Sequence, residues 1–328
     1  LDPSILDGVK ADLEKLEVIA SISAEDIYKA EEDSDIADVL KTMPKWNPNG
    51  RAMLPLTDEW AEHIEDLKSF HRTNGYGMFA KFVAFTWRNE EFVPITAIDS
   101  IRLTDLKNYE VQRGKVVDNT VAFISDLPAN NVLLYGDRGT GKSSTVHAIL
   151  NEYKNKGLRM IEISKGDIND LTMIREKISD SPMKFIIFID DLSFDNHDDS
   201  FGELKAALEG SLSGRQNNTL IYATSNRRHL IKENFSDREN DVNRSDTLQE
   251  ELSLSDRFGL SITFINPDKK DFEDIVQKIA TDRGLKSDME KILFTAEQWA
   301  RRRGGRSPRC ARQFIDYVES CEKRNIEW

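Results

Sequence analysis

One stretch, Gly136 to Ser143, constrains the fold more than any other part of the chain. It reads Gly-Asp-Arg-Gly-Thr-Gly-Lys-Ser and matches the pattern G-x-x-x-x-G-K-[S/T]. The apolar run Val132–Tyr135 precedes it, and a helix-like segment from Ser143 to about residue 153 follows. Glycines let such a loop turn tightly with its amides facing an anion, and the next helix adds its positive end. The stretch therefore predicts a site for the phosphates of a nucleoside triphosphate.

Within this loop the residue types indicate separate roles. The positively charged ammonium group of Lys142 is expected to contact the β- and γ-phosphates, and the hydroxyl of Ser143 is expected to bind Mg²⁺. The residues predicted to contact the nucleotide are Gly136, Asp137, Arg138, Gly139, Thr140, Gly141, Lys142, Ser143 and Ser144.

A second strand-like run, Phe185–Ile189, ends in the pair Asp190-Asp191. Ligands of open α/β sheets bind beyond the carboxyl ends of the strands, so this pair is expected beside the phosphate loop. Neighbouring residues of an extended strand point in opposite directions. We therefore assign Asp190 to the Mg²⁺ site, and Asp191 to orienting or deprotonating the water that attacks the γ-phosphate.

Alternation of strands and helices from residue 121 predicts an α/β core with a parallel sheet covered on both faces. Helices are expected at about 142–154, 167–179 and 201–212. The five predicted strands are Val132–Tyr135, Leu158–Ser164, Phe185–Ile189, Thr219–Ala223 and Ser261–Ile265. This pattern is typical of a doubly wound nucleotide-binding domain.

The two ends of the chain read as helical. Helical periodicity begins at Ile5, with further helices expected from Ser23, between Asp35 and Lys41, and from Thr57 to His71. Three more helices are expected after Pro267, with Gly304-Gly305 before the last of them. We therefore expect three domains: a mainly helical accessory domain at 1–95, a nucleotide-binding core at 96–266 and a helical lid at 267–328.

Composition excludes some classes of function. The net charge of −13 argues against general affinity for nucleic acid, and no apolar run reaches the length of a membrane helix. The two cysteines, Cys310 and Cys321, would lie ~16 Å apart on one helix, too far for a disulfide. A reduced, cytoplasmic setting is therefore expected.

The strand Thr219–Ala223 is followed by Thr224-Ser225-Asn226, and with this the chain resembles the AAA+ ATPases over residues 98–328. The resemblance implies that Asn226 is the first sensor, which contacts the attacking water or the γ-phosphate. Arg257, in Ser255–Gly259, resembles the arginine finger that reaches the nucleotide of a neighbouring subunit, which implies a homo-oligomer. Arg309 resembles the second sensor of the lid, with Arg306 and Arg312 as alternatives.

A narrower resemblance is to an uncharacterised bacterial AAA+ family, catalogued as a domain of unknown function with a helical front extension. It rests on Asn119–Ser144, Asp190–Phe194 and Leu252–Leu260. Most AAA+ motors end the acidic strand in Asp-Glu, whereas this chain has Asp190-Asp191. The shorter second acid implies slower turnover, and the Asp-Asp ending also resembles helicase loaders and transposition helper ATPases.

Two functions remain open at this point. The first is an ATP-hydrolysing, Mg²⁺-dependent AAA+ protein that oligomerises and remodels or positions a partner, expected to be a protein because the front of the chain is acidic. The second is a low-turnover, ATP-gated switch or loader.

Adenine is favoured over guanine by the family and by the absence of an Asn-Lys-x-Asp segment, which reads guanine. The base is expected near Ile101–Val111, with lid residues opposite. Direct nucleic-acid contact through the six arginines between Arg301 and Arg312 is not favoured, and no membrane association is expected.

Overall fold

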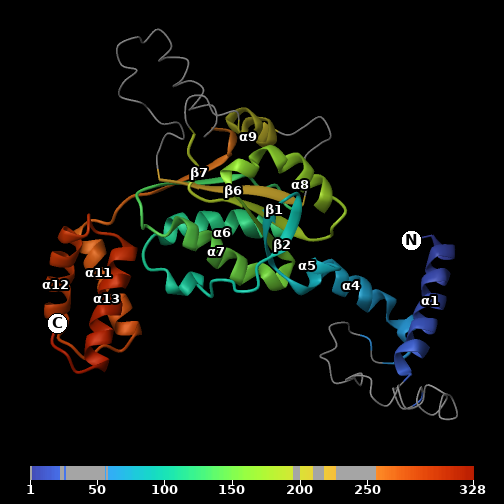
Figure 1. Ribbon diagram of the computed structural model, residues 1–328, viewed down its shortest axis with the longest axis horizontal. Helices are drawn as coiled ribbons and strands as arrows, with labels where there is room; N and C mark the ends of the chain where they lie inside the picture. Colours follow the sequence, from blue (N-terminus) through green and yellow to red (C-terminus); the bar gives the residue numbers. More distant parts are fainter. Residues whose placement is uncertain are drawn as a thin grey trace, which may run out of the picture. The chain divides into compact units, whose positions relative to one another are not determined.

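The computed structural model describes residues 2–22, 26, 56, 58–194, 200–209, 218–226 and 256–328 (Figure 1). The chain divides into two compact units, Leu1–Gly75 and Tyr76–Trp328.

The first unit contains helix α1 (Pro3–Ser21), the short 3-10 helix η1 (Trp60–His63) and helix α4 (Ile64–Asn74). Asp2 caps α1 by accepting the amide of Ser4, and proline occupies the first turn, where a missing N–H costs nothing. The Glu17 carboxylate accepts the backbone amides of Glu59 and Trp60, which joins α1 to η1. The helices predicted from Ser23 and at 35–41 lie outside the described residues.

The second unit is an α/β fold built on one mixed sheet of seven strands in the order β2-β1-β4-β5-β6-β3-β7. Among the described strands, β1 and β2 pair in antiparallel fashion, and the other neighbours are parallel. The strands are β1 (Ala84–Arg88), β2 (Glu91–Pro94), β3 (Val132–Gly136), β4 (Leu158–Ile163), β5 (Lys184–Ile189), β6 (Thr219–Ser225) and β7 (Leu260–Phe264).

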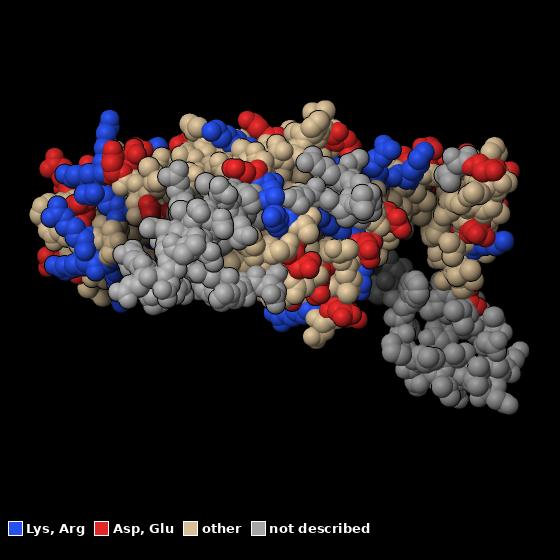
Figure 2. Space-filling model, turned by 90° about the horizontal axis from the view of Figure 1, so that it is seen from above, with Lys and Arg blue, Asp and Glu red and all other residues tan. Residues whose placement is uncertain are grey.

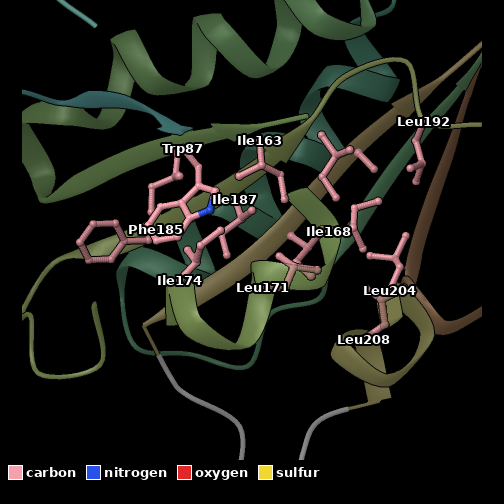
Figure 3. Close-up of a cluster of buried hydrophobic side chains, with 14 of the residues drawn as sticks. Trp87, Ile163, Ile168, Leu171, Ile174, Phe185, Ile187, Leu192, Leu204 and Leu208 are labelled. Carbon is pink, nitrogen blue, oxygen red and sulfur yellow. The ribbon is translucent and has the colours of Figure 1, made fainter. Parts of the chain in front are cut away.

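Helices cover both faces of this sheet (Figure 1). Helices α6 (Glu110–Ile124) and α7 (Lys142–Tyr153) pack on one face. Helices α8 (Leu171–Ile178) and α9 (Ser200–Glu209), with the 3-10 helix η4 (Lys165–Asp170), pack on the other. Figure 3 shows the second of these cores, where Phe185 and Ile187 of β5 meet Ile174 of α8. Burial on both faces explains why β5 reads as a continuous apolar run.

Three short helical elements lie between the strands and helices described above. They are α5 (Met78–Lys81), η2 (Leu103–Asp105) and η3 (Lys154–Lys156).

The expected count of five strands is wrong, because β1 and β2 extend the sheet. All five predicted strands are present, and β1 adds to them by pairing with β4. Phe85 and Trp87 of β1 are fully buried in the same core as β5. The expected border at residues 95/96 consequently falls inside the second unit, which begins at Tyr76.

Three helices at the end of the chain pack around a core of their own: α11 (Lys269–Asp282), α12 (Met289–Arg302) and α13 (Pro308–Lys323). Each begins at a capping side chain, Asp268, Asp288 and Ser307 respectively, which accepts an amide of the first turn. Cys310 and Cys321 are both buried on α13 and unpaired, as the spacing predicted.

Strand β1 is expected to contribute to the stability of the whole unit. Phe85→Ala removes a ring that is 0% exposed and should lower the free energy of unfolding by about 3–5 kcal/mol. Val93→Ala on β2, where the side chain is 39% exposed, is the matched control and should cost less than about 1 kcal/mol. Denaturant unfolding of the full chain measures both, and equal effects would mean that β1 is not part of the core.

Candidate nucleotide-binding site

The loop between β3 and α7 has the backbone conformation that its glycines predict. Gly136, Gly139 and Gly141 have φ values of +128°, +76° and +96°, which disfavour any side chain. A Cβ on Gly136 would lie 2.0 Å from the carbonyl oxygen of Phe264, so β7 leaves no space for one. Thr140 closes the loop by donating its hydroxyl to the Asp137 carbonyl at 2.8 Å.

Lys142 lies at the base of this loop with its side chain almost fully buried. Its Nζ donates to the carbonyl oxygens of Gly136 (2.9 Å) and Asp137 (2.7 Å) and to Oδ1 of Asn226 (3.1 Å). Burial lowers the pKa of Lys142, and nearby Arg309 acts in the same direction, whereas surrounding carboxylates oppose the shift. A bound polyanion would therefore favour the charged ammonium.

Ser143 and Asp190 form the pair expected to hold Mg²⁺. The Ser143 hydroxyl donates to Oδ1 of Asp190 at 2.6 Å, so two oxygen ligands from different elements meet beside the loop. Mg²⁺ commonly binds through one or two protein oxygens together with water and phosphate oxygens. The two residues fit such an ion, although the described residues include no cluster of three or more His, Cys, Asp or Glu side chains around one point.

Thr224, near the end of β6, organises both acids, and the sequence analysis did not single it out. Its hydroxyl donates to Oδ1 of Asp190 and accepts the backbone amide of Asp191 at 3.0 Å. Asp191 adopts a φ of +51°, which turns the chain sharply after β5. Its Oδ1 accepts the side-chain amide of Asn226 at 2.5 Å. Parallel pairing of β5 with β6 brings these groups together, and small polar residues after a buried strand were the available signal.

The three candidates for the second sensor, Arg306, Arg309 and Arg312, make different contacts. The Arg309 amide donates to the Gly139 carbonyl at 3.1 Å, which brings α13 directly onto the phosphate loop. Arg306 instead forms an ion pair with Glu297 at 2.7 Å. Arg309 and Arg312 line the cavity described next, so Arg306 is the weakest of the three candidates.

A cavity of about 500 Å³ connects these groups. Six of the nine predicted loop residues line it. The other three, Gly136, Asp137 and Thr140, stabilise the loop through hydrogen bonds to Lys142 and within the loop. The lining of the cavity is Leu106, Arg138, Gly139, Gly141, Lys142, Ser143, Ser144, Asp190, Asp191, Thr224, Asn226, Pro308, Arg309 and Arg312.

A smaller cavity adjoins it where the sequence predicts the base. Leu106 to Tyr109 line one side, and Ile275 and Ile279 of the lid line another. Arg113 holds this segment by donating to the carbonyl oxygens of Leu103 (2.8 Å) and Leu106 (2.6 Å). The two cavities share Leu106, Gly141, Pro308 and Arg312. The smaller one has a volume of about 30 Å³, which is too small for a base as it stands.

Arg257 lies far from the cavity of its own chain. It precedes the amino-terminal end of β7, which runs parallel to β3, whereas the phosphate loop follows the carboxyl end of β3. Five strand residues separate the two ends by roughly 16 Å. Arg257 does not line the cavity.

Comparison with known protein families shows to which family this chain belongs. The model of the family described as "Protein of unknown function (DUF815)" matches residues 80–322. The chain belongs to the DUF815 family. This confirms the expected membership of a family of unknown function, and the match contains the loop Gly136–Ser143, Asp190, Asp191 and most of the segment from α11 to α13. No curated protein matches the chain.

Solved structures similar to this DUF815 chain are distant. RuvB of Thermotoga maritima, a Holliday junction branch migration motor, is 17% identical with a TM-score of 0.45, over 69% of this chain and 67% of RuvB. A variant of that RuvB is 18% identical with a TM-score of 0.46, and 66% of its length is covered. The Orc1 protein of Aeropyrum pernix, in complex with DNA, is 14% identical with a TM-score of 0.47, over 67% of this chain and 61% of Orc1. Similarity at this distance says nothing of function.

Among the described helices, none combines the length and apolar character required to cross a membrane.

Gly136 is expected to be indispensable to the loop. Gly136→Ala forces a Cβ against the Phe264 carbonyl and should reduce ATP affinity at least tenfold, because the loop must move away from β7. Gly114→Ala is the control, since a Cβ there meets no atom within 4 Å and α6 favours alanine. Equilibrium ATP binding and thermal unfolding measure both variants, and unchanged affinity in Gly136→Ala would contradict the account.

Proposed function

We propose that this chain is an ATP-hydrolysing AAA+ protein that assembles into homo-oligomers and remodels or positions a partner macromolecule. The observation that carries the proposal is the bonded series Lys142–Asn226–Asp191, which links the phosphate-binding ammonium to the acid expected to activate water. A buried lysine joined through an amide to a carboxylate, beside a metal-binding pair, suits phosphoryl transfer to water.

Each residue has a defined part in this proposal. Lys142 and the loop amides bind and orient the triphosphate. Asn226 fixes one oxygen of Asp191, which leaves the other oxygen to accept the proton of the attacking water. Ser143 and Asp190 would hold Mg²⁺, which when bound neutralises charge on the phosphate oxygens. Arg309 would stabilise the γ-phosphate from the same chain.

Arg257 is proposed to complete the site of a neighbouring copy. An arginine that approaches the γ-phosphate stabilises the charge that develops as the phosphoryl group departs. This proposal is supported by the position of Arg257 before the amino-terminal end of β7, the end away from the phosphate loop of its own chain.

The second candidate function is an ATP-gated switch with little turnover. It is favoured by the shorter side chain of Asp191, which is already bonded to Asn226 and must reach its water from a turn with a φ of +51°. The steady-state rate of hydrolysis by the wild-type chain separates the two functions. Brisk turnover supports the ATPase, and tight binding with scarcely any turnover supports the switch. In both functions the partner is proposed to be a protein.

Asp191→Asn tests the role of the acid. The asparagine keeps the shape of the side chain but is a far weaker base, so hydrolysis should fall at least 100-fold while ATP affinity changes less than about threefold. Asp180→Asn, at an exposed position after α8, should leave both quantities unchanged. Phosphate release and equilibrium binding provide the readouts, and retention of full turnover in Asp191→Asn would refute the assignment.

Complementation between two inactive variants tests Arg257. Arg257→Ala keeps an intact nucleotide site, whereas Lys142→Ala loses its own site but keeps its arginine. Each alone should hydrolyse ATP at least tenfold more slowly than wild type, and mixing them should restore part of the activity. Activity of the mixture equal to the average of the two separate preparations would show that Arg257 does not act between subunits.

A further inference from the structure

A third cavity, of about 210 Å³, lies beside the phosphate loop and shares Arg138, Gly139 and Arg309 with the nucleotide cavity. We name it the arginine cavity, because Arg138 of the loop and Arg303, Arg306 and Arg309 of the lid all line it. The rest of its lining is Gly139, Asn266, Gly304, Gly305, Ser307, Cys310 and Gln313. Among the described residues no carboxylate belongs to this lining.

The charge of this cavity is unusual for an acidic chain. Lys and Arg side chains gather on the left of Figure 2, where α11, α12 and α13 lie. Of the four arginines, Arg306 is neutralised by Glu297 at 2.7 Å, and Arg303 lies over the ring of Trp299 at 4.5 Å. Arg138, Arg303 and Arg309 line the same small space without a carboxylate in that lining, so an anion that enters it would be stabilised by their positive charges.

The first-turn amides of α13 are not available to such an anion. The first turn of α13 begins with Pro308, which has no N–H. The Arg309 amide is already bonded to the Gly139 carbonyl and the Cys310 amide to the Ser307 hydroxyl. The positive end of the helix still adds to the potential, but the available donors are guanidinium groups, which match the oxygens of phosphate.

We propose that the arginine cavity binds a small phosphate-bearing anion, at a site separate from the nucleotide. The volume suits a small ion, and donors approach from two elements, the phosphate loop and the start of α13. Arg138 and Arg309 also line the nucleotide cavity. An anion in the arginine cavity therefore competes with the triphosphate for these two side chains, and each ligand lowers the affinity for the other.

Titration of the full chain with inorganic phosphate, and separately with pyrophosphate, tests the site by calorimetry. Lys142→Ala removes the cation of the nucleotide site, so saturable binding in that variant reports the arginine cavity. Wild type saturated with a non-hydrolysable ATP analogue and Mg²⁺ provides a second measurement that does not depend on the folding of that variant. We expect saturable binding of at least one of the two anions in both preparations.

Two substitutions should abolish this binding without reaching the nucleotide cavity. In both preparations, Arg303→Ala and Gln313→Glu should each weaken anion binding at least tenfold, the first by removing a donor and the second by adding a repelling carboxylate. Arg302→Ala, at the exposed neighbour of Arg303 and outside the lining, is the matched control and should change it less than twofold.

Two results would overturn the inference. One is the absence of saturable anion binding at tens of millimolar in both preparations. The other is binding that Arg303→Ala and Gln313→Glu leave unchanged. ATP affinity of the otherwise wild-type chain carrying Gln313→Glu, measured without added phosphate, should stay within threefold of wild type. A chain that binds phosphate in the arginine cavity but fails to bind ATP would contradict only the proposed function.

Discussion

The structure of the site depends on one buried ammonium group. Transfer of a charged amine out of water costs several kcal/mol unless hydrogen bonds replace its hydration. Here two carbonyls of the loop and the Asn226 side chain provide three such bonds to Lys142. The carbonyls converge because the glycines of the loop adopt positive φ values, and Asn226 is in place because β6 pairs with β3. The loop, the sheet and Asn226 are thus held around the single charge of Lys142.

The acidic side of the site is organised by Thr224 in a comparable way. One hydroxyl contacts the side chain of Asp190 and the backbone of Asp191, so the acid proposed to bind Mg²⁺ and the acid proposed to activate water share a support. Asn226, two residues further on, joins the same group to Lys142. A displacement of the end of β6 would consequently disturb the Lys142 ammonium, the Ser143–Asp190 pair and the proposed base Asp191 together.

The sequence predicted those parts of the molecule in which local pattern and function coincide. The loop glycines, the strand ending at Asp190 and the five parallel strands could be recognised from residue type and spacing. Strands β1 and β2 could not, because their aromatic residues indicate burial without identifying the partner, and pairing with β4 connects segments about 75 residues apart. Among the lid arginines the sequence favoured Arg309 but kept Arg306 and Arg312 as alternatives, and tertiary contacts separate Arg306, paired with Glu297, from Arg309 on the loop. Thr224 was missed because its role depends on a neighbouring strand.

The central claim is that this loop binds a nucleoside triphosphate, and calorimetric titration of the wild-type chain with ATP in the presence of Mg²⁺ tests it most directly. The account predicts saturable binding of one ATP per chain, displaced by ADP. No saturable uptake at millimolar ATP would contradict it.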